Sequence, residues 1–372
     1  CRIMSSSNLT IRTLTGEDDI RAVYDEWFKL AESIDPAGVT QYPQYVLSCF
    51  LAFDAIRSES RLVAVFRDNQ LRAIFPFKRV IRRLYGMPVT VLEFLDFPAS
   101  VRDVMVAPQE SVDEIFDCLT KGAAHAMGSN WDFMCFRGVL ESSVLVDLAD
   151  RRDRSAKSHY DYSHLLDVSQ EGYVQNVLKS KVRSNLRRNL KKLATRGQNE
   201  FRTVDSYPEL ESAFVSFLTT EAAGWKSVRG GKRAVMLHPD QTAFYRSLLE
   251  ESARHGRSHI HLLSLDGEPI ASDFCILTKD TCFSLKHGYD EQYSDVAPGN
   301  LLREYTVEYY GGSDVVNAID LVSGMKWHLA WQPERRKVYE VRFYNNTLRA
   351  KALYQLSGLR RSLKSSPVTE SN

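Results

Sequence analysis

Apolar side chains recur with two different spacings along the first 150 residues of the chain. Val23, Trp27, Leu30 and Ile34 recur every three to four positions, which predicts a helix over residues 18–33. Short apolar runs bounded by turn residues follow, a pattern that is typical of strands. The pattern predicts strands over residues 61–66, 71–78, 89–97 and 132–139, a turn over residues 67–70, and a helix over residues 111–127.

The second half of the chain repeats this order of elements. An apolar stripe at Leu210, Phe214 and Phe217 predicts a helix. Asp266-Gly267 lies between two apolar runs and predicts a hairpin, because Asp-Gly suits a two-residue turn between antiparallel strands. The other predicted elements are helices over residues 244–254 and 301–310 and strands over residues 259–265, 269–277, 281–289 and 315–322.

The repeated order indicates two copies of one layered unit. We predict an α/β protein of the layered α+β type, in which each unit is a mixed, mostly antiparallel twisted sheet flanked by helices. The expected units span residues 9–160 and 161–350, followed by a C-terminal helix and frayed tail at residues 351–372. The alternative is that two unrelated α/β domains share this order by chance.

Composition narrows the functional classes. The 372 residues suit two domains, and the hydrophobic fraction of 44% is that of a globular protein. Lys and Arg number 48 against 47 Asp and Glu, so the net charge of +1 argues against a general DNA-binding protein. No apolar run reaches the roughly 18 residues that a membrane-spanning helix needs, and we expect a cytoplasmic protein.

The six cysteines lack the spacing of a metal site. No Cys-x-x-Cys pair is followed by a second such pair, so the sequence predicts no metal site. Most of the cysteines lie in apolar segments, which is typical of buried thiols in a reducing compartment.

A basic helix is predicted between the two units, over residues 173–196. Lys179, Arg183, Arg187 and Lys191 recur every four residues and form one ridge. Such a ridge could attract a phosphate-rich substrate, including tRNA, or an anionic sugar chain or lipid head group. It could also be a solvated surface that acidic residues elsewhere balance.

The turn Pro298-Gly299-Asn300 joins a predicted strand to a predicted helix. Gly299 allows a close backbone turn and Asn300 suits a helix cap. The N–H groups and the positive dipole end of such a helix bind phosphate readily, although many strand-to-helix turns contain Pro-Gly for geometry alone.

Five motifs in the second half occur in an order that resembles one known family. They are Arg183 with Arg187-Arg188 before Gly197; Glu221 with Gly224-Trp225-Lys226; Gly267 with Pro269-Ile270-Ala271; Lys286 to Asp290; and Pro298 to Leu302. A closing Asp and an aromatic segment ending at Trp331 follow. This stretch, residues 163–333, resembles the bacterial GNAT acetyltransferases associated with cellulose and exopolysaccharide biosynthesis, which are related to the Fem-type aminoacyltransferases. Residues 9–150 resemble the looser N-terminal half of such proteins.

The resemblance implies two tandem GNAT-like domains with acyl-CoA as co-substrate. The CoA pyrophosphate is expected at the turn formed by Ala297, Pro298, Gly299, Asn300, Leu301 and Leu302, and the thioester along residues 281–289. The substrate-binding candidates are Glu221, Trp225, Lys226, Tyr289 and Trp331. Direct transfer needs a base, donors for the oxyanion and a proton for the thiolate, and no covalent intermediate.

Three residues are the catalytic candidates. Asp320 ends a predicted strand beside the donor site and could orient or deprotonate an acceptor. Lys286 shares the alternation of Cys282 and Ser284, which predicts that it points at the cleft. His328 stands where the family often has lysine, and a histidine titrates near neutral pH. Each has an ordinary structural alternative: a loop-capping carboxylate, a solvated lysine, and a surface or core histidine with no chemical role.

These residues leave three functions open. The first is an acyl-CoA-dependent acyltransferase acting on an amine or hydroxyl of a sugar, an amino acid or a related metabolite. The second is an aminoacyl-tRNA-dependent transferase, which the basic helix alone supports. The third is a non-catalytic binding protein in polysaccharide assembly. The net charge and the Pro-Gly turn favour the first.

Overall fold

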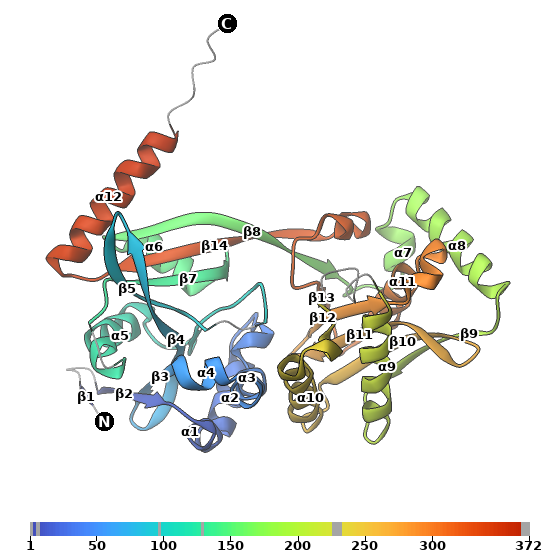
Figure 1. The fold of residues 1–372 in the computed structure, drawn as a ribbon, viewed down its shortest axis with the longest axis horizontal. Coiled ribbons are helices and arrows are strands. Elements are labelled where there is room, and N and C mark those ends of the chain that lie inside the picture. Colours follow the sequence, from blue (N-terminus) through green and yellow to red (C-terminus); the bar gives the residue numbers. More distant parts are fainter. Residues whose placement is uncertain (1–2, 5–7, 96–97, 128–129, 225–232, 366–372) are drawn as a thin grey trace, which may run out of the picture.

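The computed structural model describes residues 3–4, 8–95, 98–127, 130–224 and 233–365, with side-chain surroundings described as far as residue 358. Two lobes of mixed α/β structure lie side by side, and the long strands β8 and β14 run from one lobe to the other (Figure 1). The strands form one twisted sheet in the order β1-β2-β3-β4-β5-β7-β14-β8-β13-β12-β11-β10-β9, with β6 beside β4. Helices flank this sheet, so the predicted fold class is confirmed.

The first lobe contains the elements up to residue 151. Its strands are β1 (Ile3–Met4), β2 (Leu9–Leu14), β3 (Ser60–Arg67), β4 (Gln70–Leu84), β5 (Met87–Phe94), β6 (Met105–Val106) and β7 (Phe133–Leu140). Its helices are α1 (Glu17–Ala22), α2 (Tyr24–Ser33), α3 (Pro43–Ala52), α4 (Asp54–Glu59), α5 (Val112–Ala126) and α6 (Val144–Arg151), with the 3-10 helix η1 (Val39–Gln41).

The remaining elements build the second lobe, the connecting strands and a C-terminal helix, α12, that packs on the first lobe (Figure 1). The strands are β8 (Ser155–Asp167), β9 (Asn199–Val204), β10 (Ser258–Leu265), β11 (Glu268–Leu277), β12 (Thr281–Tyr289), β13 (Ala318–Asp320) and β14 (Glu334–Tyr344). The helices are α7 (Tyr173–Asn176), α8 (Ser180–Ala194), α9 (Glu209–Ala223), α10 (Pro239–Ala253), α11 (Pro298–Tyr310) and α12 (Leu348–Ser365). The 3-10 helices are η2 (Val235–Leu237), η3 (Glu291–Val296) and η4 (Lys326–Trp331).

The two lobes repeat one strand arrangement. In the first, β2, β3, β4 and β5 pair antiparallel in sequence and β7 joins β5 in parallel. In the second, β9, β10, β11 and β12 pair antiparallel and β13 joins β12 in parallel. Matching hairpins follow from matching turns, since Asp68 and Asn69 in one and Asp266 and Gly267 in the other all have positive φ.

The lobes also exchange their last strands. β8 follows the first lobe in sequence but pairs with β13, and β14 follows the second lobe but pairs with β7. β8 and β14 pair with each other along Ser155–Leu165 and Glu334–Phe343. The boundary expected at residues 160 and 161 therefore lies inside β8. We propose two units that share this β8–β14 ribbon.

A shared core joins the lobes below the ribbon. Tyr45 of α3 packs edge-on against Phe244 of α10, with ring centroids 5.3 Å apart. Ser247 donates a hydrogen bond to Ser48 over 3.1 Å, and Arg257 pairs with Glu32 over 2.8 Å. These contacts hold the first lobe against the face of the second lobe that α9 and α10 cover.

Two predicted helices are divided and six strands were missed. The helix expected over residues 18–33 is interrupted at Val23, and that expected over residues 173–196 is divided into α7 and α8, because Lys179 has extended backbone angles. The strands that the sequence analysis did not predict are β1, β2, β6, β8, β9 and β14. Among the described residues, none of the helices combines the length and apolar character that crossing a membrane requires.

Candidate active site

The candidate site opens where two parallel strands of the second lobe separate. β12 and β13 pair only between Thr281–Phe283 and Ala318–Asp320. β12 continues to Tyr289, whereas β13 ends at Asp320. A cavity of about 690 Å³ lies beyond the paired segment, between the rest of β12, the turn after β13, η4 and the start of α11. It can therefore hold an extended ligand between the separated strands.

The first turn of α11 forms one wall of this cavity. Ala297 has φ 48° and ψ 60°, and Pro298 follows at the first helical position, where its missing N–H costs no helical hydrogen bond. Ala297, Gly299 and Asn300 line the cavity, whereas Pro298, Leu301 and Leu302 are buried. The three buried members of the predicted pyrophosphate turn hold the helix against the core, and the three lining members are placed to contact a ligand.

Gly299 is required by close packing. A Cβ atom at this position would lie 2.5 Å from Nε2 of His287 and 3.4 Å from Cδ1 of Tyr289. Any side chain at residue 299 would therefore displace the His287 ring, which also lines the cavity. This packing brings the helix start close to β12.

A β-bulge at Leu285 changes the direction of Lys286. Cys275 is paired with Ser284, but the preceding residue Phe274 is paired with Lys286, so Leu285 is the extra residue of β12. Lys286 consequently points toward α9, where its Nζ lies 3.5 Å from Oε1 of Glu221. The prediction that Lys286 shares a face with Cys282 and Ser284 is wrong for this reason, although Lys286 lines the cavity.

Glu221 and Tyr289 line the same cavity from two different elements. The side chain of Glu221 is fully buried on α9, and its Oε2 accepts a hydrogen bond of 2.8 Å from the backbone N–H of Val235. Tyr289 is the last residue of β12. Both predicted substrate-binding residues are thus at the cavity, and Glu221 is fixed there by Val235 and Lys286.

Sequence analysis missed a buried charged pair in the cavity wall. Arg303 of α11 and Asp273 of β11 are 3% and 1% exposed, and Nη2 of Arg303 lies 3.0 Å from Oδ2 of Asp273. Ser284 donates to Asp273 over 2.7 Å and accepts from Arg303 over 2.9 Å. The pair joins α11, β11 and β12 beside the cavity that Arg303 and Ser284 line. The only sign of this pair in the sequence was one charged residue in each of two predicted apolar elements, Asp273 in residues 269–277 and Arg303 in residues 301–310.

His328 is buried at the cavity as a neutral imidazole. Its Nδ1 lies 3.2 Å from the carbonyl oxygen of Ser323 and 3.3 Å from Nδ1 of His164. Since a carbonyl only accepts, the proton on Nδ1 satisfies this contact and leaves Nε2 as an acceptor. Burial, followed by the charge of Arg303, lowers the pKa of His328 to about 4. A base that stays neutral at pH 7 is therefore present.

This shift predicts an acid-sensitive stability. The pKa of about 4 in the folded state lies below the ordinary value of about 6.5. The contribution of neutral His328 to the free energy of unfolding is therefore fully present above pH 6.5 and is lost as the pH falls toward 4. Between pH 7 and pH 4, we expect the free energy of unfolding of the wild-type protein to fall by about 2–4 kcal/mol more than that of His328→Gln. Urea unfolding at the two pH values measures this difference. His125→Gln, which replaces an exposed histidine, should follow wild type. Equal losses in wild type and His328→Gln would contradict the neutral assignment.

Asp320 is directed at Arg336 and at its own turn. Its Oδ2 lies 2.5 Å from Nη2 of Arg336, and its Oδ1 accepts from the backbone N–H of Val322 over 2.7 Å. Val322 has φ 50°, which β-branched residues rarely adopt. Asp320 does not line the cavity, whereas Val322 does. The contacts of Asp320 favour a positioning role over the expected role as a base.

The last predicted substrate residues are placed differently. Trp331 is 1% exposed and lies in the core, where its carbonyl oxygen accepts from Tyr173 over 2.7 Å. Trp327 lines the cavity and is half exposed, so the neighbouring tryptophan is the better candidate for contact with a ligand. Trp225 and Lys226 lie outside the described residues.

A second hollow lies on the basic helix α8. It measures about 500 Å³ and is lined by Ser180, Arg183, Ser184, Arg187, Arg188 and Lys191. Arg183 donates to the carbonyl oxygens of Gln175 and Leu178, so part of the ridge closes the end of α7. The other cations provide a positive surface separate from the main cavity.

Comparisons with known proteins show what this fold and cavity resemble. The chain has a tandem GNAT-like fold, and residues 180–328 match the family described as an acetyltransferase (GNAT) domain. The matched segment runs from α8 into η4 and contains the described residues that line the cavity, except Ala330. The second lobe therefore resembles a GNAT acetyltransferase domain over residues 180–328, which are less than half of the chain.

Three solved structures share the fold over most of their length. A crystal structure of FemX is 13% identical with a TM-score of 0.57, covering 90% of this chain and 98% of that one. L-PGS from Bacillus licheniformis is 11% identical with a TM-score of 0.53, covering 92% and 96%. The C-terminal domain of a putative lysylphosphatidylglycerol synthetase from Agrobacterium fabrum is 11% identical with a TM-score of 0.52, covering 91% and 97%. Comparison with curated protein sequences gives no match.

Proposed function

We propose that this protein transfers an acyl group directly from acyl-CoA to an amine or hydroxyl of a sugar, an amino acid or a related metabolite. The observation that carries the proposal is the gap between β12 and β13, closed at one end by the start of α11. The gap suits an extended donor, and the helix start suits its pyrophosphate.

In this proposal, different residues at the cavity bind different parts of the donor. Ala297, Gly299 and Asn300 receive the pyrophosphate, since their backbone forms the lining turn of α11. The bulge leaves Leu285 as an unpaired residue of β12 at the cavity, and its backbone groups bind the arm that carries the thioester. The close approach of Gly299 to His287 keeps both surfaces at a fixed separation.

His328 acts as the base in the proposed reaction. The acceptor nitrogen or oxygen attacks the thioester carbon, and its proton passes to Nε2 of His328. The bond between carbon and sulfur then breaks, and the thiolate takes a proton from the hydroxyl of Tyr289 or through solvent. Lys286 and Glu221 bind the acceptor, Trp327 covers it, and Asp320 holds the turn after β13. No covalent intermediate with the protein is needed.

The acceptor in this proposal is a polar metabolite, with a sugar unit of a polysaccharide as the favoured case. The cavity contains paired charges, such as Lys286 with Glu221, beside the exposed ring of Trp327. A tryptophan face and paired polar groups suit a sugar ring, which has both apolar and hydroxyl surfaces.

Thermal melting with candidate ligands tests the donor. We expect CoA and one acyl-CoA to raise the melting midpoint by several degrees, because a ligand that binds only the folded state stabilises it. The acyl-CoA with the largest shift identifies the acyl length. No shift with CoA or any acyl-CoA would overturn the proposal.

The basic hollow on α8 favours one second candidate, an aminoacyl-tRNA-dependent transferase. Arg187, Arg188 and Lys191 line it apart from the main cavity and could contact phosphates. Bulk tRNA in the same melting experiment separates the two functions. A shift with tRNA alone, lost on raising the salt concentration and in Arg187→Glu/Lys191→Glu, would favour the second candidate.

A further inference from the structure

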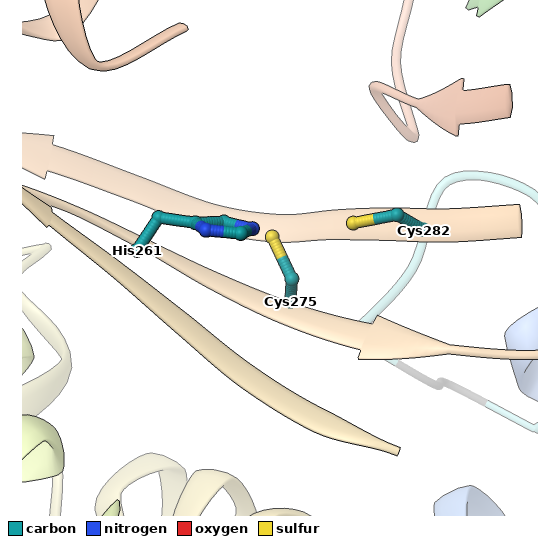
Figure 2. A group of neighbouring side chains, drawn as sticks. All are labelled: His261, Cys275 and Cys282. Atoms are coloured by element: carbon teal, nitrogen blue, oxygen red, sulfur yellow. The ribbon is translucent and has the colours of Figure 1, made fainter. Parts of the chain in front are cut away.

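Two cysteines and one histidine converge inside the second lobe, away from the proposed reaction. His261 lies on β10, Cys275 on β11 and Cys282 on β12, and all three are 0% exposed. Figure 2 shows the imidazole and the two sulfur atoms directed at one another from the three neighbouring strands. Their ligand atoms lie within 4.8 Å of one another. We propose that these three residues bind a zinc ion.

The distances are compatible with a zinc ion. Zinc binds sulfur at about 2.3 Å and imidazole nitrogen at about 2.0–2.1 Å, so two tetrahedral sulfur ligands lie about 3.8 Å apart. The ligand atoms lie up to 4.8 Å apart, so small rotations of the three side chains would bring them to these distances. Two thiolates and one imidazole are also the ligand types that zinc prefers.

The hydrogen bonds of His261 direct Nε2 toward the sulfur atoms. Its Nδ1 lies 2.9 Å from Oγ1 of Thr203, and donation to this hydroxyl places the ring proton on Nδ1. Nε2 is then free of a proton, as a metal ligand must be. Such a bond to the far nitrogen is the usual way in which proteins orient a histidine that binds a metal.

Tyr310 of α11 lies beside His261 and Cys282, and its oxygen is the candidate for the fourth ligand. Its hydroxyl lies 3.2 Å from Nε2 of His261 and also contacts Cys282. The shorter bond of this hydroxyl, 2.7 Å, is to Nδ1 of His259. Tyr310 can therefore keep its bond to His259 while its oxygen completes the coordination, or it can move aside from Nε2.

Charge balance favours zinc over a monovalent metal. Two thiolates and one Zn²⁺ sum to zero, whereas two thiolates and Cu⁺ leave a buried negative charge. Arg303 and Asp273, a buried pair of charges in the same lobe, already neutralise each other. The ion would join β10, β11 and β12 beneath α11.

Metal content of the purified full-length protein tests the proposal. We expect about one zinc per chain in wild type, below about a tenth in Cys282→Ala, and about one in Cys135→Ala, which removes another buried cysteine far from the cluster. Removal of the zinc by unfolding in a chelator should lower the melting midpoint of the refolded chain by several degrees.

A second measurement does not depend on the variants folding. Wild-type protein refolded with Co²⁺ should develop the charge-transfer absorption of a cobalt–thiolate bond, and added Zn²⁺ should remove it. Zinc below a tenth per chain together with no cobalt–thiolate absorption would overturn the proposal. Zinc that persists in Cys282→Ala, or copper in its place, would also overturn the assigned site. Neither result depends on acyltransferase activity.

Discussion

Asp273→Leu should lower the free energy of unfolding by about 3–5 kcal/mol, the largest stability effect that we expect from one substitution. Arg303 would keep its charge at 3% exposure without the carboxylate that lies 3.0 Å away. Ser284 would also lose the acceptor of its 2.7 Å hydrogen bond. Urea unfolding monitored by circular dichroism measures the change.

Two further variants identify the cause of this loss. Asp273→Leu/Arg303→Met removes both charges and should recover most of the stability, because the isolated buried cation is what costs free energy. Asp295→Leu removes a carboxylate that pairs with Lys192 and Arg196 at the surface, and its unfolding midpoint should stay close to that of wild type. If the double variant is as unstable as Asp273→Leu, the loss arises from packing instead.

Gly299→Glu should abolish binding of CoA and acyl-CoA, with a loss of affinity of at least about 100-fold, or ~3 kcal/mol. The new carboxylate would stand at the first turn of α11, where the proposed pyrophosphate lies, and would repel it. Its Cβ atom would also lie 2.5 Å from Nε2 of His287. Isothermal titration with CoA measures the affinity.

Two controls separate charge from crowding at this turn. Gly299→Ala adds the Cβ atom without the charge, and the end of the His287 side chain can shift to admit it, so we expect a loss of about 10-fold or less. Gln292→Glu adds the same charge at an exposed position of η3 that does not line the cavity, and affinity should change little. CoA affinity that is unchanged in Gly299→Glu would remove α11 from the proposed donor site.

The tandem arrangement was predictable because each unit repeats the same local signals. Asp68-Asn69 and Asp266-Gly267 fix matching hairpins through their own backbone preferences, and the apolar stripes at Trp27 and Phe214 mark helices by spacing alone. β8 and β14 were missed because much of β8 is exposed and β14 carries charged residues over half its length. Pairing with strands of both lobes stabilises these two strands.

Predictions about the site depended on how far apart its residues lie in sequence. The turn from Ala297 to Asn300 was recognisable because its chemistry resides in consecutive residues. The direction of Lys286 was not, because one bulge at Leu285 reverses the alternation that a regular strand would keep. Trp331 and Trp327 could not be ranked, since only packing against Tyr173 shows that Trp331 belongs to the core.

By itself the sequence determined the elements with strong local preferences, their repetition, and the helix start that suits a phosphate. Only the tertiary structure decided which polar residues meet. Asp273 and Arg303 are 30 positions apart, and His261, Cys275 and Cys282 come from three strands, yet each set converges because neighbouring strands and α11 bring them within a few ångströms. Local spacing encodes secondary structure, whereas contact between distant side chains follows from strand order and register, which depend on the packing of the whole chain.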